Sequence, residues 1–174
     1  MSTAPHLRLA DPPPLAAEDL YARYAKYVAR LGFRLLGRDD GLDDLVQDVF
    51  LAATAAKVRS SNEHEARGWL ATVTVRLAGR VLRRRRLARF FGLDEGPDER
   101  LLSTGASPET VTLMAQLYRR LDAAPTAERL AWTLRYVENE PLDEVARLCG
   151  CSLATAKRRI AAVQRLVTET DDEA

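Results

Sequence analysis

The residues best suited to metal or redox chemistry are Cys149 and Cys151, which lie one residue apart and are the only cysteines in the chain. A structural zinc site needs four nitrogen or sulfur ligands at regular spacing. The only two histidines, His6 and His64, are far apart and form no finger pattern with the cysteines. A disulfide between Cys149 and Cys151 would close a tight ring, and cytoplasmic thiols stay reduced. We therefore expect no metal, no cofactor and no redox pair.

No other group of residues suggests catalysis. The sequence contains no phosphate-binding P-loop and no glycine-rich dinucleotide turn. Neither histidine has an evident nucleophile as a partner, so a catalytic triad is not indicated. We expect a protein that is not an enzyme and that has no small-molecule substrate.

Charge is unevenly distributed along the chain, although the net charge is only +1. Residues 39–48 include five acids and no base, whereas residues 76–89 include seven arginines and no acid. Basic residues return at 157–159 and at Arg165, and the chain ends in the acidic sequence TETDDEA. A basic helical face of this kind is the electrostatic signature of a protein that binds a polyanion such as nucleic acid.

Apolar residues recur at helical spacing through most of the sequence, and no strand-like alternation is present. The pattern predicts an all-α protein with two small helical domains, one over residues 15–91 and one over 108–168. Glycines and prolines over 92–107 predict a flexible linker between them. Residues 1–14 are expected to be a disordered N-terminus and 169–174 an acidic tail. No apolar run is long enough to span a membrane and no signal peptide is evident, so we expect a cytoplasmic protein without membrane insertion.

The predicted core stripes assign most large apolar residues to packing. The first helix contributes Leu20, Tyr21, Tyr24, Tyr27, Val28, Leu31 and Leu35. Trp69 falls on the core stripe of the third helix, so we expect it to pack rather than to bind a ligand.

The cysteine pair fits the turn of a helix-turn-helix unit. Cys149 lies on the apolar stripe of a short helix, Gly150 can end that helix in a left-handed conformation, and Ser152 can cap the next one. On the second helix Leu153, Ala156, Ile160, Val163 and Val167 form the expected buried stripe. The candidate DNA-binding residues on this helix are Thr155, Lys157, Arg158, Arg159 and Arg165. Thr155 and Arg158 could reach base edges, and the other basic residues suit phosphates.

Two further faces lie on the predicted second and third helices. Asp44, Gln47, Asp48 and Leu51 share one side of a helix and suit docking onto a basic protein surface. Arg76, Arg80, Arg83 and Arg84 form a basic ridge that suits a phosphate backbone. The simpler alternative for each face is a charged surface that is only solvated.

Three segments, in this order, resemble the extracytoplasmic-function (ECF) sigma factors, which are two-domain initiation subunits of bacterial RNA polymerase. DDLVQDVFLAA is similar to the polymerase-docking segment of region 2, and RGWLATVTVRLAGRVLRRRR to the segment that binds the −10 element. LRYVENEPLDEVARLCGCSLATAKRRI is similar to the region 4 helix-turn-helix that binds the −35 element.

The resemblance implies an alternative sigma factor whose partners are core RNA polymerase, promoter DNA and an anti-sigma factor. It places Asp44, Gln47 and Asp48 at the polymerase and Thr155, Lys157 and Arg158 at the −35 element. Some positions depart from the family. Arg76 and Arg80 stand where it often has asparagine and aspartate, and Pro141 replaces the usual cap serine. The loop SSNEHEA lacks the usual aromatic residue and glycine of the base-capture loop.

Two other functions remain compatible with the pattern. The first is a helix-turn-helix regulator that binds DNA without polymerase, and copurification with core polymerase would separate it from a sigma factor. The second is an RNA-binding or scaffold protein, for which single-stranded RNA would compete with promoter duplex.

Overall fold

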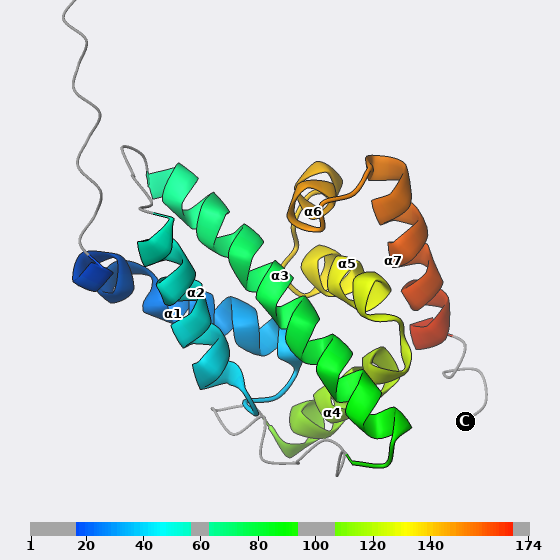
Figure 1. The fold of residues 1–174 in the computed structure, drawn as a ribbon. Coiled ribbons are helices and arrows are strands. Elements are labelled where there is room, and N and C mark those ends of the chain that lie inside the picture. Colours follow the sequence, from blue (N-terminus) through cyan, green and yellow to red (C-terminus); the bar gives the residue numbers. More distant parts are fainter. Residues whose placement is uncertain (1–16, 57–62, 94–106, 169–174) are drawn as a thin grey trace, which may run out of the picture.

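The computed structural model describes residues 17–56, 63–93 and 107–168. These residues form α-helices and no strand, which confirms the predicted all-α class (Figure 1). The helices are α1 (Ala17–Leu36), α2 (Leu42–Ala55), α3 (Glu63–Phe90), α4 (Pro108–Ala123), α5 (Thr126–Tyr136), α6 (Leu142–Leu148) and α7 (Leu153–Thr168). Helices α1–α3 form a first bundle and α4–α7 a second.

The first bundle packs α1 and α2 against each other and against α3. Most of the predicted stripe of α1 is buried, including Val28 and Leu35. Tyr21 was wrongly predicted as core, because it is 53% exposed and its ring contacts Phe50 with the ring centroids 4.9 Å apart. Adjacent helical residues point about 100° apart, so the burial of Leu20 does not bury Tyr21 with it. Trp69 packs against the core, as predicted.

The second bundle is organised around α5, which packs against α6 and α7. Ser107 caps α4 by accepting a hydrogen bond from the Thr110 amide at 3.3 Å, and Pro108 occupies the first turn. Ala156, Ile160 and Val163 of the expected α7 stripe are buried. Leu153 was wrongly assigned to that stripe: it is 44% exposed at the first residue of the helix.

The two bundles contact each other, an arrangement that the sequence did not predict. In Figure 1 α3 runs between α1 and α2 on one side and α5 and α6 on the other. Besides its predicted stripe, α3 buries a second apolar set: Ala71, Val75, Ala78 and Leu82. Gly79 lets α5 approach closely, since a Cβ there would lie 3.2 Å from Leu130. Helix α3 therefore contributes buried residues to the first bundle and also to its contact with the second bundle.

Several expectations concern other parts of the chain. The disordered N-terminus (1–14), the acidic tail (169–174) and most of the predicted linker (92–107) lie outside the described residues and remain predictions. Of the helices the structure describes, none combines the length and apolar character needed to cross a membrane.

Candidate nucleic-acid and protein interfaces

The helix-turn-helix predicted around the cysteines is present, with the expected turn chemistry. Helix α6 ends before Gly150, which has a φ of 59°. The amide of Cys151 donates to the Ala146 carbonyl at 3.0 Å, and that of Gly150 donates to the Arg147 carbonyl at 3.1 Å. Such bonds satisfy the last carbonyls of a helix that ends in a left-handed residue. Ser152 then caps α7 by accepting from the Thr155 amide at 3.2 Å.

The two cysteines contribute to packing at this turn. Cys149 is half-buried against the core. Burial raises the pKa of its thiol to about 11, so it stays protonated at neutral pH. A protonated thiol is a poor metal ligand and a poor nucleophile.

Helix α7 presents most of its predicted DNA-binding residues to solvent. Lys157, Arg158 and Arg165 are exposed. Thr155 is half-buried, and its hydroxyl lies 2.9 Å from that of Ser152. Arg159 is also half-buried and lines a cleft of about 310 Å³ together with Arg83 of α3. The exposed part of the predicted face is therefore narrower than the sequence suggested.

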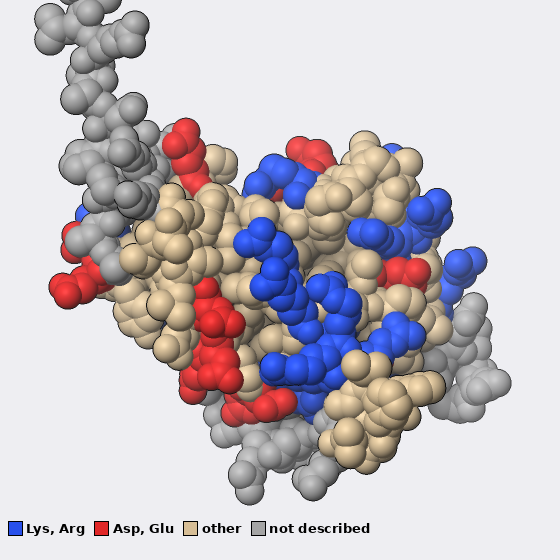
Figure 2. Space-filling view, in the orientation of Figure 1, with Lys and Arg blue, Asp and Glu red and all other residues tan. Residues whose placement is uncertain are grey.

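The arginine run of α3 divides into two groups. The predicted ridge, Arg76, Arg80, Arg83 and Arg84, is exposed and contributes to the basic area in the centre of Figure 2. Arg85 instead turns inward and is only 7% exposed. It donates to the Leu36 carbonyl at 3.3 Å, and burial lowers its pKa to about 10. Since Arg85 is held inside the protein, only part of the run is available to a polyanion.

The predicted docking face of α2 is open to solvent. Asp44, Gln47 and Asp48 are exposed, and Leu51 is 60% exposed. Gln47 and Leu51 border a groove of about 690 Å³ that is also lined by Tyr21, Phe50 and other residues of α1 and α2. The sequence analysis missed the aromatic part of this groove. The sequence signal was weak, because consecutive helical residues point about 100° apart and yet pairs such as Leu35 and Leu36 are both buried.

The acidic face and the arginine ridge also adjoin each other. Asp44 and Asp48 share a groove of about 440 Å³ with Arg80 and Arg84. Acidic atoms accordingly border basic atoms in Figure 2. Within the described residues, no ion pair joins the two sets across this groove. The carboxylates and guanidiniums are therefore free to meet different partners.

Part of the atypical segment SSNEHEA is helical. Residues 60–62 lie outside the described part of the chain, whereas Glu63 starts α3 and Ala66 is buried in the core. The second half of the segment is thus the first turn of α3. No base-capture residue is assigned to it.

Comparison with known protein families agrees with this architecture. Residues 20–88 match Sigma-70 region 2, and residues 114–163 match Sigma-70 region 4. These matches cover most of both bundles. The ECF RNA polymerase sigma factor SigE of Mycolicibacterium smegmatis is 30% identical over 147 residues, a match covering 82% of this chain and 56% of the relative. The ECF RNA polymerase sigma-E factor of Escherichia coli K12 is 28% identical over 151 residues, covering 81% of this chain and 78% of that protein.

Solved structures show the same fold. One is the sigma factor RpoE in complex with the anti-sigma factor NepR from Bartonella quintana, with a TM-score of 0.61, 19% identity, and coverage of 90% of this chain and 96% of that one. Another is CnrH in complex with the cytosolic domain of CnrY, with a TM-score of 0.59, 22% identity, and coverage of 91% and 89%. A helical region 2 followed by a helix-turn-helix region 4 defines a sigma factor of the Sigma-70 class. The chain belongs to the extracytoplasmic-function sigma factor family.

Proposed function

We propose that this protein is an alternative sigma factor, which binds core RNA polymerase and directs it to a set of promoters. The observation that supports this most strongly is the presence, in family order on one chain, of region 2 and region 4. A regulator that acts without polymerase needs the helix-turn-helix but has no use for region 2. The protein would act in transcription initiation, in the cytoplasm, and not as an enzyme.

The exposed faces suggest which surface of the protein contacts which partner. Asp44, Gln47, Asp48 and Leu51 of α2 would contact core polymerase, with Tyr21 and Phe50 extending the contact. Arg76, Arg80, Arg83 and Arg84 of α3 would contact the −10 region. Residues of α7 would contact the −35 element, with Arg158 at base edges and Lys157, Arg159 and Arg165 at phosphates. Thr155 would help to position the start of α7, because its amide and hydroxyl both lie at hydrogen-bond distance from the hydroxyl of Ser152.

An anti-sigma factor is a further expected partner. RpoE of Bartonella quintana and CnrH were both solved as complexes, the first with the anti-sigma factor NepR and the second with the cytosolic domain of CnrY. A protein of this kind would regulate the chain by competing for its exposed faces.

Charge reversal on α2 tests the docking proposal. The double change Asp44→Lys with Asp48→Lys should raise the Kd for core polymerase about tenfold or more, since both carboxylates are exposed and would face a basic surface. The matched control is Glu109→Lys with Asp143→Lys, which reverses two exposed acids on the second bundle. Equal affinity of the docking variant and the parent for core polymerase would rule out this face as the docking site. Far-UV circular dichroism checks that both variants keep their helicity.

A further inference from the structure

The end of α3 exposes large apolar side chains of a kind that proteins normally bury. Leu87 is 58% exposed, Phe90 82%, Phe91 64% and Leu93 78%. The two phenyl rings meet edge to face, with their centroids 5.4 Å apart. We call these four residues the α3 tip. Neighbouring exposed apolar side chains mark interaction sites, so the tip requires a partner.

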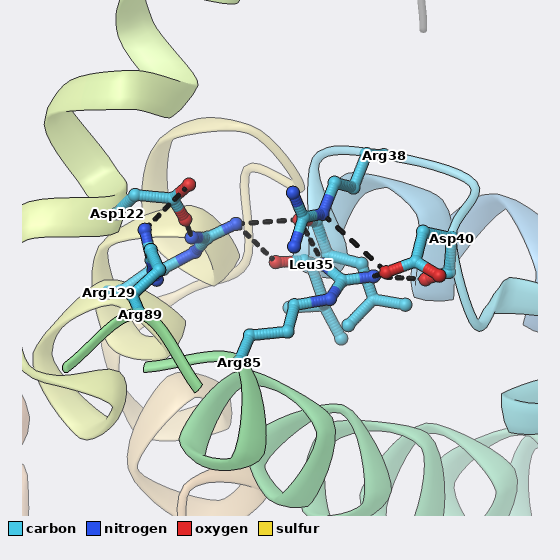
Figure 3. A network of polar contacts seen from close by, with 8 residues as sticks. Leu35, Arg38, Asp40, Arg85, Arg89, Asp122 and Arg129 are labelled. Atoms are coloured by element: carbon cyan, nitrogen blue, oxygen red, sulfur yellow. Dashed lines mark hydrogen bonds and ion pairs between the residues drawn. The ribbon is translucent and has the colours of Figure 1, made fainter. Parts of the chain in front are cut away.

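Two inward-facing arginines determine which side of α3 faces solvent at this end (Figure 3). Arg85 donates to the Leu36 carbonyl at 3.3 Å, and Arg89 pairs with Asp122 at 3.0 Å. Residues four apart lie on the same side of a helix, so these two contacts hold that side against the protein. Leu87, two residues after Arg85, points about 200° away from it and therefore outward.

The backbone beyond α3 turns back onto the helix end. Gly92 has a φ of 68°, and its amide donates to the Arg89 carbonyl at 3.0 Å. The amide of Leu93 donates to the Ala88 carbonyl at 2.9 Å. Such bonds are typical of a helix that ends in a left-handed glycine. Leu93 is therefore fixed at the end of the helix together with the other three residues of the tip.

The outer side of α3 changes from basic to apolar toward its end. Arg83 and Arg84 are exposed, Leu87 follows one turn later, and Phe90 and Phe91 follow one turn after that. Residues three or four apart share a helical face, so these five lie on one side. Residues 76–93 contain no acid. In Figure 2 an uncharged area accordingly adjoins the basic area where α3 ends.

The spacing along this face matches the layers of a membrane surface. Six residues separate Arg84 from Phe90 within α3, which corresponds to about 9 Å along a helix. Interfacial helices bury their apolar side about 5–10 Å into the boundary between headgroups and acyl chains. Apolar side chains at that depth would leave Arg83 and Arg84 at the level of the lipid phosphates. Arginine binds phosphate through several donors at once, so this position suits both residues.

The composition of the tip favours lipid over nucleic acid. Unpaired bases stack on aromatic rings, which would cover Phe90 and Phe91. Bases offer no comparable contact to the aliphatic side chains of Leu87 and Leu93. Acyl chains bury aliphatic and aromatic groups alike. The exposed arginines behind the tip add attraction to a negatively charged surface, as anionic headgroups provide.

We propose that the α3 tip, with Arg83 and Arg84, is a peripheral binding site for an anionic lipid surface, at which no segment crosses the bilayer. This inference goes beyond the proposed sigma factor function and does not depend on it. Arg83 and Arg84 also belong to the ridge proposed for the −10 region. A lipid-bound chain could not use them on DNA, so membrane and promoter would compete for the free protein.

Cosedimentation of the full chain with lipid vesicles tests this site. The probes are vesicles of phosphatidylglycerol and phosphatidylcholine in equal parts, and vesicles of phosphatidylcholine alone. The parent should bind the anionic vesicles at least about tenfold more tightly than the neutral ones, and added salt should weaken this binding. Equal affinity for both kinds of vesicle, or binding to neither, would overturn the proposal.

A pair of double variants tests the apolar residues. Phe90→Ser with Phe91→Ser removes both rings and should weaken binding to the anionic vesicles at least about tenfold. The matched control is Leu113→Ser with Leu153→Ser, which removes two exposed leucines from α4 and α7 and should bind as the parent does. Far-UV circular dichroism checks that both variants keep their helicity. If the phenylalanine variant binds these vesicles as tightly as the control, the tip does not insert.

Insertion can also be measured directly with Phe90→Trp. Its fluorescence should shift to the blue on addition of anionic vesicles and be quenched by lipids brominated on their acyl chains, because residue 90 would lie among those chains. Leu113→Trp is the control, since it carries the same native Trp69 and Trp132 and should show neither change. Equal quenching of the two variants would contradict insertion at the tip.

The same variants distinguish lipid from other partners. A parent that binds no vesicles, together with a phenylalanine variant that loses affinity for a single-stranded oligonucleotide, would identify the tip as a base-stacking site. A loss of affinity for core polymerase instead would identify a protein contact. Either result would overturn the lipid site. None of the vesicle measurements involves transcription, so failure of the proposed sigma factor function would not change them.

Discussion

At the scale of single residues, exposure distinguishes side chains that the sequence could only group together. Arg158 and Arg165 both lie on α7 and are exposed, but Arg158 lies near its start and Arg165 in its last turn. The first turns of a recognition helix approach base edges, whereas its far end lies near the phosphates. The two arginines should therefore make different contributions to binding.

Arg158→Ala should reduce discrimination among −35 sequences, since a lost base contact costs about 1–3 kcal/mol at one position. Arg165→Ala, the matched control, should weaken binding to all −35 sequences alike. It should also reduce by about one the slope of log binding constant against log salt concentration. Binding of polymerase with each variant to a −35 mutant series, at several salt concentrations, measures both effects. A uniform loss with Arg158→Ala would identify that residue as a phosphate contact.

Cys149 offers a second test at this scale. Because burial raises its pKa to about 11, its thiolate fraction at pH 8 should be about a hundredfold below that of an ordinary thiol. We expect slow alkylation by iodoacetamide in the folded protein, accelerating as the pH approaches 11, and fast alkylation in urea. Mass spectrometry at residue level measures the rates. Fast alkylation of folded Cys149 at pH 8 would show a reactive thiol and reopen the redox interpretation.

At the scale of the helices, the periodicity of apolar residues predicted which segments are helical and which side of each faces its own bundle. The turn at Gly150 and the caps at Ser107 and Ser152 follow from local chemistry, so they were also predictable. The second buried face of α3 was not predicted. Its residues are small or apolar, but their partner α5 lies far along the chain, and periodicity carries no information about contacts between distant segments.

Two glycine substitutions test how local backbone conformation affects stability, and they should change the free energy of unfolding in opposite directions. Gly150→Ala should destabilise the protein by about 1–2 kcal/mol, because alanine is strained at a φ of 59° although no atom lies within 4 Å. Gly68→Ala lies inside α3 and meets only the Arg147 side chain at 3.6 Å, so it should stabilise by about 0.5–1 kcal/mol. Urea unfolding measures both free energies. A Gly150→Ala variant as stable as the parent would show that the turn can adopt another conformation.

At the scale of the whole molecule, the presence of region 2 followed by region 4 on one chain supports the sigma factor proposal more strongly than either region alone. The candidate site residues were placed on exposed faces largely as predicted, with Thr155 and Arg159 half-buried. Arginines of α3 and α7 lie close together only because the two bundles pack against each other, so that Arg83 and Arg159 line one cleft. The groove joining Tyr21 to the docking face likewise appears only when α1 and α2 pack together.

The central claim is that the chain directs polymerase to promoters, and run-off transcription tests it most directly. Core RNA polymerase would transcribe fragmented genomic DNA with and without the protein. We predict new transcripts with discrete start sites that appear only with the protein and are lost with Asp44→Lys, Asp48→Lys. The same transcripts with core polymerase alone, or binding of the protein to promoter DNA without any polymerase-dependent transcript, would contradict the assignment as a sigma factor.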